Sequence, residues 1–269
     1  MEISLWHPFG FLSRYFQMDF ASLGPEFPGF SPIHLSWDSN FFKADMYKIP
    51  PFESGSLKQD QVRSLFRKKR THIMAEVPAE ATYHIRDLCQ AGFSLVETRL
   101  HYYHLLHLQP SEKLTSRSAE TADIENLKLV AAGAVNEFDR YHSDPFFSGE
   151  EASNYLSTYI ANCINGFAEI VLVPPFPTFP ASFCAVSRIA DPCWKENRPL
   201  FRIPLTACLP ANKGWHFTLC HQALHYAKEQ GGAAMLMTTQ ATNKAVMHNC
   251  EKLGFKLGSC THIFTISNS

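Results

Sequence analysis

The chain has 269 residues, of which 45% are hydrophobic and 18% are charged, so it has enough apolar material for one large domain or two modest ones. This composition excludes a disordered or fibrous chain, and a formal net charge of −1 argues against nucleic-acid binding by bulk charge. The eight cysteines include no CxxC pair, which favours reduced thiols and a cytoplasmic location over a disulfide scaffold.

The first part of the chain predicts an irregular extension followed by a small domain. Residues 1–34 are rich in aromatic residues, glycine and proline, and they lack the basic start and apolar core of a secretory signal. Residues 35–115 predict a smaller N-terminal α/β domain, because 57–69 and 79–91 have helical character and 92–100 has the character of a strand.

Three features of the sequence are compatible with ligand binding or with a membrane-spanning segment, but each has a simpler structural explanation. The basic run at 67–70 follows a helical stretch, where cations suit the helix C-terminus, so nucleic acid is not a predicted partner. His101, His104 and His107 lie three residues apart on a predicted strand that points them to different faces, so no metal site is predicted. Four prolines interrupt the uncharged run at 170–187, so no membrane-spanning helix is predicted.

The second part of the chain predicts a larger domain. A polar stretch at 109–123 predicts a linker, and residues 120–269 form the predicted domain. Apolar runs at 169–173 and 183–189 predict the two strands of a hairpin around a proline-rich turn.

Residues 201–259 carry the strongest pattern in the chain. An apolar run, a turn marked by proline and glycine, a helical stretch, a second apolar run and a second helical stretch follow one another. This order predicts two β–loop–α units in series. The loop at 210–214 leads directly into a helix whose first backbone amides have no partner within the helix, so it predicts an anion-binding site.

Several motifs in this stretch occur together in a known family. KGWHFTL follows a strand, a second strand ends in TTQ, and ATNKA and CEKLGF come next. This series resembles the acetyl-CoA half of the GNAT-type N-acetyltransferases. LSWDSNFF, GFSLVETRL and the segment 143–173 are similar to one branch of that family, the dTDP-fucosamine N-acetyltransferases, and they extend the resemblance over residues 35–265. The resemblance implies an α+β fold, with a central mixed, mostly antiparallel sheet flanked by helices.

The resemblance also implies an activity and a cofactor. The implied reaction moves an acetyl group from acetyl-CoA to the amine of a nucleotide-linked amino-deoxysugar in surface-polysaccharide synthesis, and no metal is expected. The strand would pair its backbone with the pantetheine arm, while the loop amides and Lys213 would hold the diphosphate. The implied cofactor-binding residues are Thr206, Ala207, Cys208, Leu209, Lys213, Gly214, Trp215, His216, Phe217, Thr218 and Asn243.

Three positions depart from the family pattern. His216 and Thr218 stand where the family has glycines, which let the backbone approach a diphosphate closely. Cys250 stands where the family has a tyrosine, the usual general acid toward the leaving thiolate. A thiol can donate a proton, so Cys250 is the candidate acid. The alternative is a small buried cysteine that fills the core.

The candidate general bases lie in RYHSDPFF, where ionisable side chains crowd a short segment. His142 and Asp144 are the candidate catalytic residues, since a histidine suits proton transfer at neutral pH. Glu137 and ordered water are alternatives. Residues that cap a following helix would look the same in one sequence.

The sequence leaves three functions open. The first is the N-acetyltransferase described above, either as a monomer or as a homodimer. The second is a binding or regulatory protein that kept the fold and lost the cofactor site, which the changes at His216, Thr218 and Cys250 motivate. The third is an acyltransferase with another donor, such as acyl carrier protein or a larger acyl-CoA. Binding of acetyl-CoA separates the first from the other two.

Overall fold

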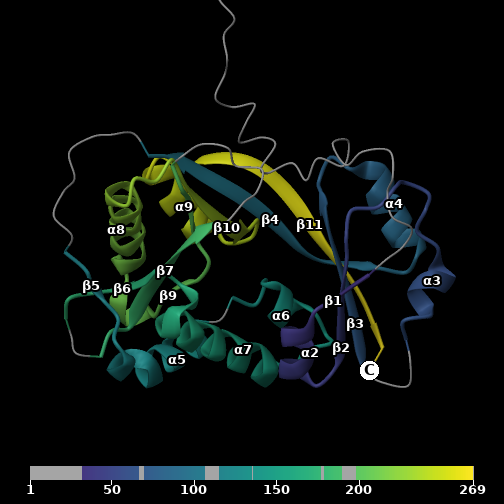
Figure 1. Cartoon of the computed structure of the whole chain (residues 1–269), viewed down its shortest axis with the longest axis horizontal. Coiled ribbons are helices and arrows are strands. Elements are labelled where there is room, and N and C mark those ends of the chain that lie inside the picture. The colour runs from purple at the N-terminus through teal and green to yellow at the C-terminus, as the bar shows by residue number, and fades with distance from the viewer. Residues whose placement is uncertain are drawn as a thin grey trace, which may run out of the picture. The chain divides into compact units, whose positions relative to one another are not determined.

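The computed structural model describes residues 32–66, 70–106, 115–134, 136–176, 179–189 and 198–268. Their helices and strands are coloured in chain order in Figure 1. The chain divides into two compact units. The first takes in the chain up to His101, Phe138–Ser148 and Gly258–Ser269, and the second takes in Tyr102–Glu137 and Gly149–Leu257. Both units combine segments far apart in sequence, whereas the predicted domains are continuous ranges, and their boundaries stay a prediction.

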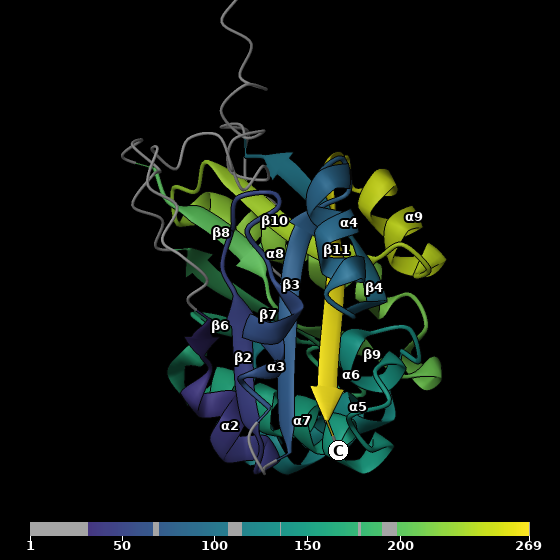
Figure 2. The same cartoon turned by 90° about the vertical axis from the view of Figure 1, so that its right-hand side faces the viewer.

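In the described ranges, the first unit contains a mixed sheet and four helices. Figure 2 shows the structure from a second side. Its strands are β1 (Ile33–His34), β2 (Asp45–Ile49), β3 (Thr71–Pro78), β4 (Ser94–Leu105) and β11 (Lys256–Asn268). Its helices are α2 (Ser36–Phe42), α3 (Gln59–Arg63), α4 (Thr82–Gln90) and α6 (Arg140–Ser143). The strand order is β1-β2-β3-β11-β4, with β2 parallel and β11 antiparallel to β3. Both β4 and β11 have residues in each unit.

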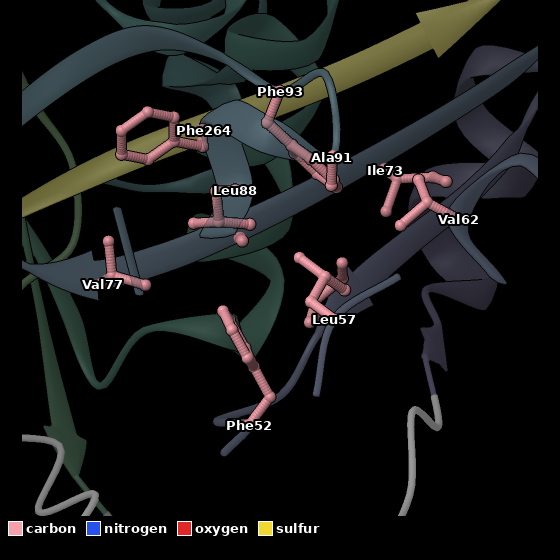
Figure 3. Close-up of a cluster of buried hydrophobic side chains, with 11 residues drawn as sticks. Phe52, Leu57, Val62, Ile73, Val77, Leu88, Ala91, Phe93 and Phe264 are labelled. Atoms are coloured by element: carbon pink, nitrogen blue, oxygen red, sulfur yellow. The ribbon is translucent and has the colours of Figure 1, made fainter. Parts of the chain in front are cut away.

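Alternate side chains of β3 point to the two faces of this sheet. Ile73, Ala75 and Val77 enter an apolar core on the face that α3 and α4 cover. Figure 3 shows the other labelled members of this core, which are Phe52, Leu57, Val62, Leu88, Ala91, Phe93 and Phe264. His72 and Met74 point to the opposite face, where they line a cavity together with residues of α2 and α6. One strand therefore supplies both an apolar core and a polar site.

The second unit contains a further set of strands and helices. Its strands are β5 (Arg117–Ser118), β6 (Ile170–Val173), β7 (Ser182–Ile189), β8 (Leu200–Ile203), β9 (Thr206–Cys208) and β10 (Ala234–Gln240). Its helices are α5 (Ile124–Gly133), α7 (Gly149–Asn162), α8 (Trp215–Glu229) and α9 (Lys244–Lys252), with the short helical turns η1 (Thr121–Asp123), η2 (Cys163–Phe167) and η3 (Pro210–Asn212). The strand order is β10-β8-β7-β6-β5, and β9 pairs with β7.

Helices cover both faces of this second sheet. Phe183 and Ala185 of β7 lie in a core with Leu127 of α5 and Ile160 of α7. Cys184 lies between them on the strand and so points to the other face, where it contacts Cys220 of α8. The predicted mixed sheet flanked by helices is therefore confirmed (Figure 1).

Several predicted elements are confirmed with shifted bounds. The two β–loop–α units are present as β8 and β9 followed by α8, and β10 followed by α9. The predicted hairpin is the antiparallel pair of β6 and β7. The helix predicted at 57–69 is confirmed only as the shorter α3, while the strand predicted at 92–100 continues as β4 to Leu105. The stretch 109–123 is not all linker, since β5 pairs with β6.

Several features named in the sequence fall partly outside the described residues, including residues 1–31 of the predicted extension and 109–114 of the predicted linker. Residues 67–69 of the basic run and His107 lie in the gaps between the described ranges. Within those ranges, no helix combines the length and the apolar character needed to cross a membrane.

Candidate functional site

Two central strands of the second unit pair and then separate. β8 and β10 are parallel neighbours from Leu200 opposite Ala234 to Ile203 opposite Met237. Beyond Ile203 the chain continues as β9, which pairs with β7, while β10 runs on to Gln240. Among the described strands, β9 therefore has a partner along one edge only. Its other edge presents backbone N–H and C=O groups that can pair with the amides of an extended ligand.

The turn after β9 leads the chain into the N-terminus of α8. Gly214 has a φ of +100°, in the left-handed region that glycine adopts without strain. A Cβ added at Gly214 would meet nothing within 4 Å, so the turn is open on that side. Lys213 is exposed beside it, and the first amides of α8 follow. Because these amides have no acceptor within the helix, the turn can bind an anion.

His216 stands in the first turn of α8, at a position where the resemblance noted in the sequence would place a glycine. Its Nδ1 lies 2.8 Å from Nδ2 of Asn249 on α9, and the Sγ of Cys220 lies 3.9 Å from the ring. These contacts hold the imidazole against α9. The backbone N–H of His216 is hydrogen-bonded to the Cys208 thiol. Backbone donors of α8 therefore point toward the end of β9.

The other candidate residues of this site are divided between β9, the start of α8 and the start of α9. Thr206 Oγ1 donates to the Phe183 carbonyl at 2.8 Å, which fixes β9 on β7. Trp215, Phe217 and Thr218 lie in the first turn of α8, and Ala207 and Leu209 pack against the core that contains α5. Asn243 caps α9, where its Oδ1 accepts from the Val246 N–H at 3.2 Å.

Cys250 lies in the core of the second unit. Its side chain is 0% exposed, and its Sγ lies 3.6 Å from the Sδ of Met237 on β10. Burial raises the pKa of this thiol to about 12, with smaller contributions from Cys220 and Glu251. These observations favour the packing alternative, while the role of general acid stays a prediction.

Asp144 lies in the first unit, where it forms a buried pair with His72 of β3. The Nε2 of His72 is 2.8 Å from Oδ2 of Asp144, and both residues are 3% exposed. Burial acts to raise the pKa of Asp144, but hydrogen bonds from His72, the Phe146 N–H and Thr265 hold it below its usual value. No motif in the sequence pointed to His72, which is far from Asp144 along the chain.

His142 pairs with a different aspartate. Its Nδ1 lies 2.7 Å from Oδ2 of Asp139. Asp139 also caps α6 by accepting from the backbone N–H groups of Tyr141 and His142. In the described part of the chain, Nε2 of His142 has no hydrogen-bond partner. An aspartate that fixes one ring nitrogen is part of the arrangement a general base needs, but Nε2 is buried here, so the role of His142 as base stays a prediction.

A small cavity on this face of the first unit is lined by His72, Asp144, Asp38, Arg140 and Tyr141, among others. Its volume is about 10 Å³, which is room for about one water molecule. Burial raises the pKa of Asp38, and the Arg140 charge offsets part of that rise. The enclosed space is too small for a sugar or a nucleotide.

Comparison with known proteins gives structural matches only. No protein-family model and no curated protein sequence matches the chain. A GCN5-related N-acetyltransferase from Sphaerobacter thermophilus is 14% identical with a TM-score of 0.50, over 78% of this chain and 64% of that one. A GNAT-family acetyltransferase from Colwellia psychrerythraea is 14% identical with a TM-score of 0.51, over 83% of this chain and 78% of that one.

The chain has the GNAT fold.

A conserved protein of unknown function from Staphylococcus epidermidis matches over more of the chain. It is 12% identical with a TM-score of 0.62, over 96% of this chain and 100% of that one. The chain spans about two thirds of the length of the Sphaerobacter protein, at 64%. At such identities the GNAT fold is shared, and the chemistry has to be argued from this chain's own residues. Among the described residues, no group of three or more His, Cys, Asp or Glu side chains is arranged to hold a metal ion.

Proposed function

We propose that the chain is an N-acyltransferase that uses acetyl-CoA as its acyl donor. The proposal depends mainly on one observation within the second unit. The chain pairs with β10 as β8, then leaves β10 and continues as β9, next to the open turn at Gly214. The free edge of β9 pairs with the amides of the pantetheine arm and polarises the thioester carbonyl. The amides and dipole of α8, with Lys213, hold the diphosphate.

In this proposal the acceptor amine loses its proton to His142. Asp139 fixes Nδ1 of the ring, so Nε2 is the atom that takes the proton, and this buried atom has to become exposed for the step. Asp144 is a poor base, because its pKa is lowered and its oxygens are engaged with His72 and the Phe146 N–H. Ordered water is the alternative base. The leaving thiolate then takes a proton from water rather than from the buried Cys250.

The acceptor we propose is the amine of a nucleotide-linked amino-deoxysugar, in the cytoplasm. Its support is the similarity of LSWDSNFF, GFSLVETRL and the segment 143–173 to the dTDP-fucosamine N-acetyltransferases. A different acyl donor is the second candidate, favoured by the presence of His216 and Thr218 in place of glycines.

Acetyl-CoA is expected to stabilise the protein against heat. At a concentration of about one hundred times its Kd, binding to the folded state alone adds about 2.7 kcal/mol to the free energy of unfolding. For a chain of this size, that raises the Tm by roughly 5–10 °C. Differential scanning fluorimetry measures the shift.

The matched control for this titration is S-acetylpantetheine, which keeps the thioester and the arm but lacks the diphosphate. It should bind much more weakly if the turn at Gly214 holds the diphosphate. The absence of any shift with millimolar acetyl-CoA would contradict the proposed donor. Release of free CoA on adding dTDP-linked amino sugars then tests the acceptor, and release only with other acyl-CoA donors would favour the second candidate.

Cys250→Ala tests the general acid. Because the thiol is buried against Met237, we expect the variant to lose about 1–2 kcal/mol of stability from the cavity it leaves. Turnover of the folded variant should stay close to that of the parent. A fall in kcat of about a hundredfold, with unchanged acetyl-CoA binding, would instead give the thiol the role of acid. Denaturant unfolding and steady-state kinetics on the same samples separate the two effects.

A further inference from the structure

A second cavity lies in the second unit, on a face of α8 that the proposed reaction does not use. Its volume is about 290 Å³, at the small end of the range for small-molecule sites. The lining residues are His104, Leu105, Leu106, His221, Leu224, His225, Lys228 and Leu253. None of them belongs to the residues proposed to bind acetyl-CoA.

The spacing along α8 explains how its polar side chains come together. His221, His225 and Lys228 are four and three residues apart, so they share one face of the helix. The Nε2 atoms of His221 and His225 are 3.3 Å apart, and the two rings meet edge to face at a centroid distance of 4.5 Å. His104 reaches the same cavity from β4, where its ring packs edge-on against Phe255.

The cavity combines these nitrogen atoms with four leucine side chains. Lys228 contributes a positive charge, and imidazoles can donate N–H groups. None of the lining residues is acidic, so the lining supplies a carboxylate or a phosphate with donors and with no opposing charge. The leucines offer an apolar surface beside these donors.

Two alternatives are less well supported by the same residues. A pair of histidines four residues apart can bind a transition metal, but no third His, Cys, Asp or Glu in the described ranges completes a metal group. The positive charge of Lys228 in the same lining also disfavours a cation. A purely apolar ligand would displace water from the Lys228 ammonium without supplying an anion in its place, which is costly.

We propose that this cavity binds a small ligand with an anionic head group and a short apolar chain. The head group lies against Lys228 and the imidazoles, and the chain lies on Leu105, Leu224 and Leu253. The site is separate from the acetyl-CoA site, so either can be present without the other.

The experiment is a calorimetric titration of the full chain with octanoate, with octyl phosphate as a second arm that distinguishes carboxylate from phosphate. Octan-1-ol and octylamine keep the chain but lack the anion, and acetate keeps the anion but lacks the chain. We expect saturable binding of at least one of the two anions. The three control compounds should bind at least about tenfold more weakly, because each lacks either the anionic head group or the apolar chain.

A pair of lysine variants makes the test specific to the cavity. Lys228→Met and Lys252→Met each remove a lysine from the last turn of a helix, but only Lys228 lines the cavity. Lys228→Met should weaken binding about tenfold or more, because a charge-assisted hydrogen bond is lost, while Lys252→Met should leave it unchanged. His225→Phe keeps the ring and removes its nitrogen atoms, so it should also weaken binding.

Three results would overturn the proposal. These are no binding of either anion at millimolar concentration, equal binding of octan-1-ol, and equal losses in the two lysine variants. Acetyl-CoA binding, measured on the same samples, reports on the proposed function independently. A failure at this cavity with intact acetyl-CoA binding therefore leaves the N-acyltransferase proposal standing.

Discussion

His72→Ala is expected to lower the free energy of unfolding by about 3–5 kcal/mol, the largest loss we expect from any single substitution named here. The variant leaves the buried Asp144 carboxylate without the imidazole that lies 2.8 Å away, and it opens a space between Phe146 and Phe147. The Phe146 N–H and Thr265 remain as partners, so the carboxylate is under-satisfied rather than isolated. Chemical denaturation measures the loss.

His72→Gln is the matched control, because its amide nitrogen can occupy the place of Nε2 and donate to Asp144. His72→Gln should recover a large part of the stability that His72→Ala loses. If the two variants are equally unstable, the packing of the ring matters and the hydrogen bond does not.

The Asp144 pair also predicts a pH effect. Because the pKa of Asp144 is lowered from 3.8, its contribution is present above that pH and is lost as the pH falls below it through the folded-state value. Asp144→Asn should remove this acid-dependent part of the stability curve.

Gly214→Asp is expected to separate acetyl-CoA binding from stability. Asp and Asn tolerate the left-handed backbone better than other side chains, and an added Cβ meets nothing within 4 Å, so the variant should fold. A carboxylate at a helix N-terminus even favours the helix. The same carboxylate repels a diphosphate about 4 Å away by about 1–4 kcal/mol, which weakens acetyl-CoA binding by roughly tenfold to several hundredfold.

Two controls isolate the charge and its position. Gly214→Asn has the same shape without the charge and should bind acetyl-CoA more tightly than Gly214→Asp. Gly231→Asp places the charge beyond the other end of α8, at a glycine with a φ of +75° and an equally open surrounding, and it should leave binding unchanged. If Gly214→Asp and Gly214→Asn bind acetyl-CoA equally well, the diphosphate does not lie at this turn.

The sequence was most informative about features that depend only on residues close together along the chain. Helical spacing and the glycine of the turn located α8, and the two apolar runs located β8 and β10. The anion-binding character of the turn also follows from local chemistry, because free amides at a helix N-terminus need no distant partner. These parts of the fold could therefore be predicted, together with the local chemistry on which the proposed cofactor site depends.

The partners of the candidate catalytic residues could not be predicted in the same way. His72 meets Asp144 only because β3 lies opposite α6 in the first unit, and neither its spacing nor its neighbours in sequence indicate that contact. Cys250 was a candidate acid because it stands where the resembled family has a tyrosine, but its complete burial against Met237 depends on how α9 packs on β10. The cavity around Lys228 likewise needs β4 and α9 to close around α8.

The pairing of β3 with β11, which is far from it along the chain, has a consequence for biosynthesis. Residues from Gly258 onward form an inner strand of the first unit, where β11 lies between β3 and β4 and pairs with β3 from Thr71 to Pro78. Until the residues of β11 leave the ribosome, β3 has an open edge that can pair with other nascent chains. The second unit has almost all of its residues by then. We therefore expect the first unit to finish folding only after β11 has left the ribosome, and a stop codon before residue 258 to yield an aggregation-prone product.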